Sequence, residues 1–506
     1  MREQLVETMR AMEALTGRKM NIYENLNVND FVMDGEKMTK FTSMSPLEAS
    51  KFWKMKHEEE ETEISISEEV HAFPLDGAFA LKKVLEKEMG TAVAKAKAGF
   101  FGPIPPTLRN IETGFGKQEQ VIWGNFSVPG IEGGEFETGV AWGREGQPVF
   151  VIRGTAKKKY QKTIKMLADK VREYVKEHSV YKGKALRLFT DDEGNIDMDN
   201  PPAFMDTSKT DPGELIFSRE IEEEVKTTLF YPIQYTDKCR HFKFPLKRGI
   251  LFEGKYGTGK TLTANVTAKL CEETAKTRTS QDERWTFIYV DKATAVKQAM
   301  IFARHFSPAV VFAEDIDRAT SGGRTVKVDD IMNNVDGVDS KNQDIILILT
   351  TNYVENIDPG MKRPGRIDSI ITVTPPDAEA VERLLRLYGR GYINESEDLT
   401  AAAKALEGQI PAVIREAVEK SKLYRIADSV IGQPMIITCE SIVKATKSME
   451  GHLLHMKPKE LPDPTPQQLL SEGFTRLVAG EVDTRVTTDF KPLRKQVGAI
   501  HERIVN

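Results

Sequence analysis

A glycine-rich stretch in the middle of the chain constrains its fold more than any other segment. Residues 247–264 read KRGILFEGKYGTGKTLTA, in which a short apolar run precedes the pattern Gly254-x-x-x-x-Gly259-Lys260-Thr261. Glycine residues allow a loop to wrap with its backbone N–H groups pointing inward at phosphate oxygens. A helix that begins near Lys260 adds the positive end of its dipole at the same point. The stretch therefore predicts a buried strand, a phosphate-binding loop and the start of a helix.

Two side chains of this loop have expected partners in a bound nucleotide. Lys260 would reach the β- and γ-phosphates as a point charge, and the Thr261 hydroxyl would ligate Mg²⁺. A chain of this length matches the pattern by chance roughly one time in fifty, but the strand before the loop and the helix after it favour a real site. We therefore expect ATP and Mg²⁺ as cofactors, with nucleotide contacts from Gly254, Gly257, Thr258, Gly259, Lys260, Thr261 and Leu262.

The composition is typical of a soluble protein with several domains. The chain has 506 residues, of which 40% are hydrophobic and 29% are charged. Its three cysteines lie far apart, which indicates a reducing compartment. No apolar run approaches the roughly 18 residues of a membrane span, and the first residues lack the apolar core of a signal peptide. We therefore expect a cytoplasmic protein without a membrane segment.

Short apolar runs alternate with helical patterns downstream of the loop. Runs of this length, separated by helices, predict a parallel sheet that is covered on both faces. After Pro375 and Pro376 the pattern is helical to about residue 457, with Asp377 as the expected N-cap, which indicates a helical lid. The fold class is thus α/β with a parallel five-stranded sheet, whose strands are expected at 249–253, 286–290, 309–313, 345–349 and 369–373.

The region before the loop is expected to form a smaller α+β domain. Glycine-separated strand patterns over 119–155 precede an amphipathic helix at 157–178. The sequence therefore divides into a loosely ordered segment (1–70), an α+β partner-recognition domain (71–192), a linker (193–213), the phosphate-binding core (214–376), the lid (377–457) and a linker with a C-terminal tail (458–506).

Three further motifs supply the groups that hydrolysis of a phosphoanhydride requires. Glu314 and Asp315 end an apolar run, where one carboxylate can hold Mg²⁺ and the other can activate a water. Asn352 ends the next run, and its amide can both donate and accept hydrogen bonds. Arg363 and Arg366 lie in a turn rich in proline and glycine, and arginine binds developing phosphate charge as a fork. Each motif alone could be structural, but their order after the loop favours a catalytic site.

The order of these motifs resembles that of the AAA family within the AAA+ ATPases. The resemblance covers about residues 213–445. It implies a ring, usually a hexamer, with ATP between subunits and hydrolysis completed in trans by Arg363 and Arg366. The matching segments are Walker A at 254–261, Walker B at 309–315, sensor 1 at Asn352, the second region of homology at 358–368 and the lid segment at 408–417.

The Walker B motif departs from the usual pattern of this family. The family ends this motif in Asp-Glu, whereas this chain has Glu314-Asp315, so the alignment gives Glu314 the metal role and Asp315 the role of the base. This order resembles the branch that contains the mitochondrial assembly ATPase of respiratory complex III, although that member's membrane helix has no counterpart in the sequence. Residues 289–299 also lack the aromatic pore loop of protein unfoldases.

Three candidate functions are compatible with these motifs. The favoured one is a Mg²⁺-dependent ATPase that cleaves the β–γ phosphoanhydride, forms a homohexameric ring and remodels a protein client or assembly through its N-terminal domain. A nucleic-acid motor or loader would need a basic, aromatic-lined path, whereas the net charge is −5 and basic groups are scattered. A nucleotide-gated scaffold without hydrolysis is prompted by the reversed carboxylates, but the intact Asn352, Arg363 and Arg366 argue against it.

Overall fold

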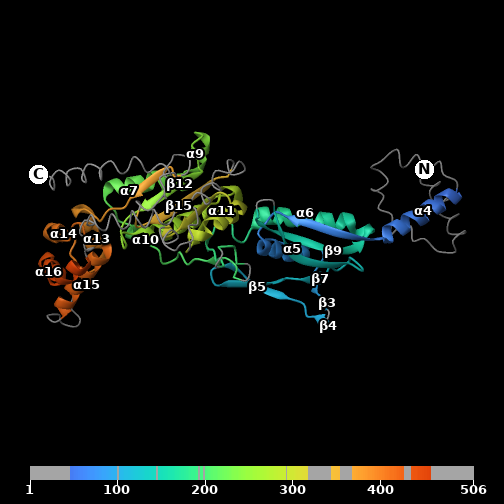
Figure 1. The fold of residues 1–506 in the computed structure, drawn as a ribbon, viewed down its shortest axis with the longest axis horizontal. Helices are drawn as coiled ribbons and strands as arrows, with labels where there is room; N and C mark the ends of the chain where they lie inside the picture. Colours follow the sequence, from blue (N-terminus) through green and yellow to red (C-terminus); the bar gives the residue numbers. More distant parts are fainter. Residues whose placement is uncertain are drawn as a thin grey trace, which may run out of the picture.

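A seven-stranded sheet crosses the middle of the molecule and carries the phosphate-binding loop (Figure 1). Its order is β11-β10-β13-β14-β15-β12-β16, and neighbouring strands are parallel except for β11 and β10. The structure is a computed structural model that describes residues 46–99, 102–143, 146–191, 194–197, 200–291, 293–316, 343–353, 367–426 and 435–456. The strands of this main sheet are β10 (Ala185–Arg187), β11 (Ala203–Phe204), β12 (Arg248–Glu253), β13 (Thr286–Val290), β14 (Ala309–Ala313), β15 (Ile345–Thr351) and β16 (Ser369–Thr372).

Successive side chains of the main sheet point into two different apolar layers. On one face Phe252 and Phe312 pack with helix α10 (Lys260–Thr277), and on the other face Leu251 and Val311 belong to the layer of α11 (Val296–His305). A strand that is apolar on both faces needs helices on both sides of its sheet. The predicted α/β fold with five parallel strands and helices on both faces is therefore confirmed.

Two strands of the main sheet come from outside the predicted core. Strand β10 lies in the segment assigned to the N-terminal domain, and β11 lies in the segment assigned to the linker, yet β10 pairs in parallel with β13. These strands contain three and two residues. The run at 184–192 reads as a strand from the sequence, but only its pairing with the distant β13 assigns it to the main sheet. The two residues of β11 carry too little periodicity to be recognised.

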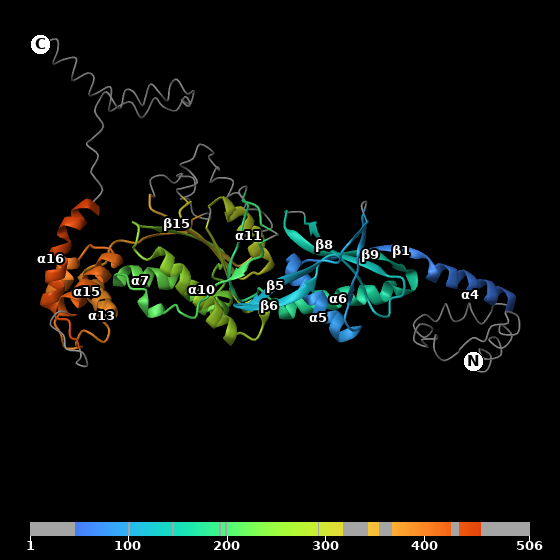
Figure 2. The ribbon, with the colours of Figure 1, turned by 90° about the horizontal axis from the view of Figure 1, so that it is seen from below.

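The N-terminal unit is a five-stranded sheet covered by two helices on one face, α5 (Pro74–Glu88) and α6 (Gln161–His178) (Figure 2). The sheet has the order β1-β9-β8-β7-β2. Two small hairpins and a preceding helix, α4 (Pro46–Glu61), complete the unit. Its strands are β1 (Glu63–Val70), β2 (Val93–Ala94), β7 (Asn125–Ser127), β8 (Glu135–Trp142) and β9 (Pro148–Lys157), and the hairpins are β3 (Lys97–Gly99) with β4 (Gly102–Ile104) and β5 (Leu108–Gly114) with β6 (Lys117–Ile122).

Strand β1 lies inside the segment that the sequence predicted to be loosely ordered. It pairs antiparallel with β9 along its whole length, from Glu63 opposite Lys157 to Val70 opposite Phe150. The expected boundary at residue 70 is therefore wrong in the structure. Apolar and polar residues alternate in β1, so that Ile64 and Ile66 lie on the same face. This short pattern was not recognised because it directly follows an acidic run.

One apolar core joins the N-terminal unit to the main sheet. The ring of Phe73, just before α5, lies edge-on to Phe302 in α11 with the ring centroids 5.0 Å apart. It also meets Tyr181 at 5.7 Å, and Tyr181 meets Phe306 at 5.9 Å. The two units therefore share a packed interior and are not separated by an open linker.

The described residues of the lid form four helices with their own apolar core. Its first helix begins as predicted, because the Oδ1 atom of Asp377 accepts a hydrogen bond from the backbone N–H of Ala380 at 2.8 Å. The lid helices are α13 (Ala378–Tyr388), α14 (Thr400–Leu406), α15 (Pro411–Ile426) and α16 (Cys439–Met456).

Short helices connect the N-terminal unit to β12. Ser218 precedes α7, and its side chain makes no capping hydrogen bond. None of the helices within the described ranges is long and apolar enough to cross a membrane. The connecting elements are α7 (Arg219–Val225), the π-helical turn η3 (Lys226–Phe230), α8 (Tyr231–Gln234) and α9 (Thr236–His241), and the 3-10 turns are η1 (Lys158–Tyr160), η2 (Pro212–Glu214), η4 (Gln281–Glu283) and η5 (Ala293–Ala295).

Candidate functional site

The glycine-rich loop connects the end of β12 to the start of α10. Gly257 and Gly259 have φ angles of 75° and 107°, a region that residues with a side chain rarely adopt. A Cβ atom at Gly254 would lie 2.6 Å from the carbonyl oxygen of Val373. Three glycines of the motif are therefore required by the path of the backbone.

The side chain of Lys260 lies buried beneath this loop. Its ammonium donates hydrogen bonds to the carbonyl oxygens of Gly254 and Lys255, the latter at 3.0 Å, and to Oδ1 of Asn352 at 2.8 Å. Only 8% of the residue is exposed. The loop thus holds one positive charge against the end of β15, which is where the sequence placed the sensing amide.

The two carboxylates that follow β14, the strand next to β15, are hydrogen-bonded to Thr261 and Asn352. Glu314 accepts a hydrogen bond at Oε1 from the Thr261 hydroxyl, at 2.6 Å. Asp315 accepts one at Oδ1 from Nδ2 of Asn352, at 3.1 Å. Hydrogen bonds therefore link the loop, the Walker B carboxylates and Asn352.

The backbone turns sharply at Asp315. Its φ angle is 49°, in the left-handed region, and its N–H donates to the hydroxyl of Thr350 at 3.0 Å. Aspartate tolerates this conformation better than most residues. The turn directs the carboxylate of Asp315 toward Asn352.

These groups line one open pocket of about 310 Å³. Five of the seven expected nucleotide contacts line it, all except Gly254 and Thr258. The buried hydroxyl of Thr258 donates to Lys255 O at 2.8 Å and so stabilises the loop. Arg363 and Arg366 lie outside the described residues.

Several neighbours of the pocket were not found from the sequence. Tyr256 and Thr350 line it, and Tyr289 donates a hydrogen bond to Glu314. A Cβ atom at Gly259 would lie 3.3 Å from the ring of Phe217, and one at Gly257 would lie 3.2 Å from Cδ1 of Ile410 in the lid. For Thr350, the position at the carboxyl end of a parallel strand was an available signal. Tyr256 lies inside the motif at 254–261, and nothing local in the sequence marks the others.

The donor set fits Mg²⁺. This ion binds oxygen, demands octahedral geometry and usually keeps several waters or phosphate oxygens among its ligands. Thr261 and Glu314 place a hydroxyl and a carboxylate oxygen 2.6 Å apart at the start of α10. Within the described ranges no cluster of three or more His, Cys, Asp or Glu residues is placed to hold a metal alone. The site therefore suits a metal that is shared with a nucleotide.

The basic run at 157–159 is neutralised by its neighbours. Lys157 and Lys159 pair with Glu61 at 2.5 and 2.6 Å, and Lys158 pairs with Glu59. The acidic run at the end of α4 thus faces the start of α6. Each of the three consecutive lysines is therefore paired with a carboxylate of α4.

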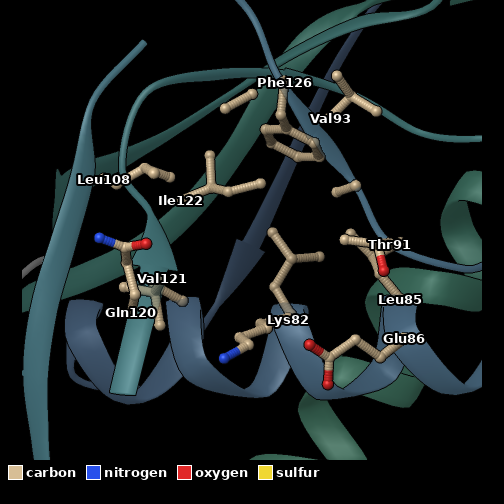
Figure 3. A pocket seen from close by; sticks show the side chains of 14 residues that line it. Lys82, Leu85, Glu86, Thr91, Val93, Leu108, Gln120, Val121, Ile122 and Phe126 are labelled. Atoms are coloured by element: carbon tan, nitrogen blue, oxygen red, sulfur yellow. The ribbon is translucent and has the colours of Figure 1, made fainter. Parts of the chain in front are cut away.

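A second hollow lies in the N-terminal unit between α5 and the strands around β6 (Figure 3). Its volume is about 380 Å³, and its lining is mostly aliphatic, with Phe126 at one end. Val93 and Leu108 on its rim are 57% and 50% exposed. Lys82 and Glu86 supply the charges at its edge. The hollow suits an apolar side chain better than a phosphate.

The part of the chain that contains this pocket is similar to known proteins. Residues 250–375 match the family model described as "ATPase family associated with various cellular activities (AAA)". The chain is 27% identical over 220 residues to the 26S proteasome regulatory subunit 8 homolog of Schizosaccharomyces pombe, covering 41% of this chain and 54% of that protein. It is 27% identical over 198 residues to a putative cell division cycle ATPase of Plasmodium falciparum, covering 37% of this chain and 16% of that protein.

The chain thus spans about half or less of the length of these curated relatives. The family match runs from β12 to just beyond β16 and confirms the resemblance to the AAA family that the motifs indicated. The resemblance to the branch with the complex III assembly ATPase stays a prediction.

Proposed function

We propose that this chain, which carries an AAA ATPase domain of the AAA+ family, binds ATP with Mg²⁺ at the Lys260 pocket and hydrolyses the β–γ phosphoanhydride bond. The observation that carries the proposal is the connected set of hydrogen bonds from Thr261 to Glu314 and from Lys260 through Asn352 to Asp315. Hydrolysis requires a phosphate cradle, a metal ligand and a positioned base, and one pocket contains candidates for all three.

Each residue has a distinct role in this proposal. Lys260 and the backbone N–H groups of the loop bind the phosphates, and Thr261 with Glu314 would hold Mg²⁺. The bound metal would neutralise charge on the phosphate oxygens. Asp315 accepts the proton of the attacking water, and Asn352 orients both Asp315 and that water.

The finer proposal is that subunits form a homohexameric ring and that Arg363 and Arg366 act on the ATP of a neighbouring subunit. It is supported by the family resemblance, because the nucleotide sites of the AAA family lie between subunits of a ring. The cytoplasm remains the expected location.

We also propose that the ring acts on a protein or a macromolecular assembly. A relative named as a proteasome regulatory subunit supports a protein-directed role. The exposed apolar rim of the hollow at Val93 and Leu108 supports contact between the N-terminal unit and an apolar segment of a client. The paired state of the lysines at 157–159 argues against the nucleic-acid motor.

The first experiment is steady-state ATP hydrolysis by the purified chain, with the mass of the ATP-bound protein measured in parallel. We expect turnover that rises with protein concentration, a six-subunit species and no nucleotide binding by Lys260→Ala. ATP binding without turnover at any protein concentration would instead favour the nucleotide-gated scaffold.

A mixing experiment tests the action in trans. Arg366→Ala subunits and Lys260→Ala subunits should each be inactive alone and should regain part of the activity when mixed. A mixture without regained activity would contradict the shared site.

A further inference from the structure

Both oxygens of the Glu314 carboxylate are held from opposite directions. Oε1 accepts the 2.6 Å hydrogen bond from Thr261, and Oε2 accepts a 3.0 Å hydrogen bond from the hydroxyl of Tyr289. Tyr289 lies in β13, on the far side of β14 from the glycine-rich loop, and only 7% of it is exposed. The carboxylate is therefore clamped between two elements that are distant in the sequence.

The length of Glu314 explains why such a second contact matters. A glutamate has one more rotatable bond than the aspartate that usually occupies this position in the AAA family, so fixing its carboxylate costs more conformational entropy. A buried hydrogen-bond donor at the outer oxygen restricts that freedom before any metal binds. The clamp thus compensates for the reversed order of Glu314 and Asp315.

The ring of Tyr289 is itself restrained on both faces. It is stacked with Phe312 at a centroid distance of 6.3 Å and an interplanar angle of 16°. The guanidinium of Arg187 lies 5.1 Å from its centroid.

We propose that Tyr289 is a positioning residue that fixes the Glu314 carboxylate for the Mg²⁺ of the bound nucleotide. The inference rests on the proposed function of the pocket. It also gives β10 a role, because Arg187 and Tyr289 are paired residues of adjacent parallel strands. The segment upstream of the glycine-rich loop thereby supports the metal-binding side of the site.

The test compares nucleotide affinity with and without the metal, using a fluorescent ADP analogue in excess Mg²⁺ or in EDTA. Tyr289→Phe removes only the hydroxyl. We expect its affinity to fall about threefold to tenfold in Mg²⁺, the effect of one lost hydrogen bond of ordinary strength, and to remain unchanged in EDTA. Equal loss under both conditions would show a merely structural role and overturn the proposal.

Glu314→Asp provides a second and independent test. The shorter carboxylate does not reach the hydroxyl of Tyr289, so adding Tyr289→Phe to Glu314→Asp should produce no further loss of Mg²⁺-dependent affinity. If the double variant lost as much Mg²⁺-dependent affinity as the sum of the two single variants, the clamp would be contradicted.

Tyr181→Phe is the matched control. Its hydroxyl is also buried, but it has no hydrogen-bond partner among the described residues, so the variant should retain the affinity of the unmodified chain under both conditions. Lys260→Ala distinguishes failure of the proposed nucleotide site from failure of the clamp. If Lys260→Ala binds the analogue normally, the proposed function fails. If Lys260→Ala loses affinity but Tyr289→Phe binds normally in Mg²⁺, only the clamp is refuted.

Discussion

The ammonium of Lys260 is hydrogen-bonded to Oδ1 of Asn352 at 2.8 Å, and both residues line the pocket. The same amide donates from Nδ2 to Asp315 at 3.1 Å. Because Lys260 is the expected ligand of the β- and γ-phosphates, a bound nucleotide would compete with Asn352 for its ammonium. Asn352 is thus placed to report the arrival of phosphate to the proposed base.

Replacing Asn352 should therefore impair turnover more than binding. We expect Asn352→Ala to lower kcat about a hundredfold, as when one positioned transition-state donor is removed. The dissociation constant for ATP should change by less than about threefold, because the loop and Lys260 remain. Steady-state kinetics and equilibrium binding measured side by side decide the point. An equal loss in both would mean that Asn352 supports binding only.

The left-handed backbone at Asp315 determines which substitution tests the base. Asparagine tolerates this conformation, so Asp315→Asn should keep the fold and bind ATP while hydrolysis collapses. Asp315→Ala should also lose hydrolysis and should in addition lose roughly 1 kcal/mol of stability, because alanine is strained at this φ. Turnover assays and thermal unfolding of the two variants separate these effects. Unimpaired turnover by Asp315→Asn would assign the base elsewhere.

The five core strands could be predicted from the sequence because each is a continuous apolar run with a turn at either end. The residues of the pocket could also be predicted, since the ends of adjacent parallel strands converge on the same edge. Asp377 was recognisable as an N-cap because that preference acts over only three residues.

Tyr289, Phe217 and Ile410 could not be predicted as neighbours of the site. Their contacts depend on strand order and on the docking of the lid, which no local pattern encodes. Strand β1 was missed because it follows a charged run. The apolar run at 184–192 does read as a strand, but its place in the main sheet is defined only by the pairing of β10 with β13.

The hollow of the N-terminal unit yields a prediction about clients. Leu108→Glu places a charge on its apolar rim and should weaken binding of permanently unfolded carboxymethylated lactalbumin about tenfold, because burying that charge is costly. Fluorescence anisotropy of the labelled protein measures the affinity. Leu423→Glu is the matched control, since Leu423 is 65% exposed but lies in the lid. Equal weakening by both variants would exclude a specific role for the hollow.

Asp76 and His305 line one small cavity where the N-terminal unit meets the main sheet. Burial raises the pKa of Asp76 from 3.8 to about 6, although Ser179 and Val180 donate hydrogen bonds to its carboxylate. Burial lowers the pKa of His305 from 6.5 to about 4. Other titratable groups that line the cavity are His71, Arg172, Lys176, Lys182 and Asp282.

The two shifts act on stability with opposite signs. Between about pH 4 and pH 6 the folded state binds the proton of Asp76 and the unfolded state does not, so this group makes the chain less stable as the pH rises. His305 does the reverse between about pH 4 and pH 6.5, since only the unfolded state binds its proton. The two contributions largely cancel in the unmodified chain.

In Asp76→Asn, the pH dependence of stability should therefore come from His305 without the opposing effect of Asp76. The asparagine can still accept from Val180 and can donate to the Ser179 hydroxyl, so the contact between the two units persists. One pKa unit corresponds to about 1.4 kcal/mol. As the pH rises from 4 to 7, the free energy of unfolding of the variant should therefore increase by roughly 2 to 3 kcal/mol relative to that of the unmodified chain. Melting temperatures of both proteins across this range measure the gain. A difference between them that does not change with pH would show that Asp76 titrates at its ordinary value and that its burial is offset by the two hydrogen bonds.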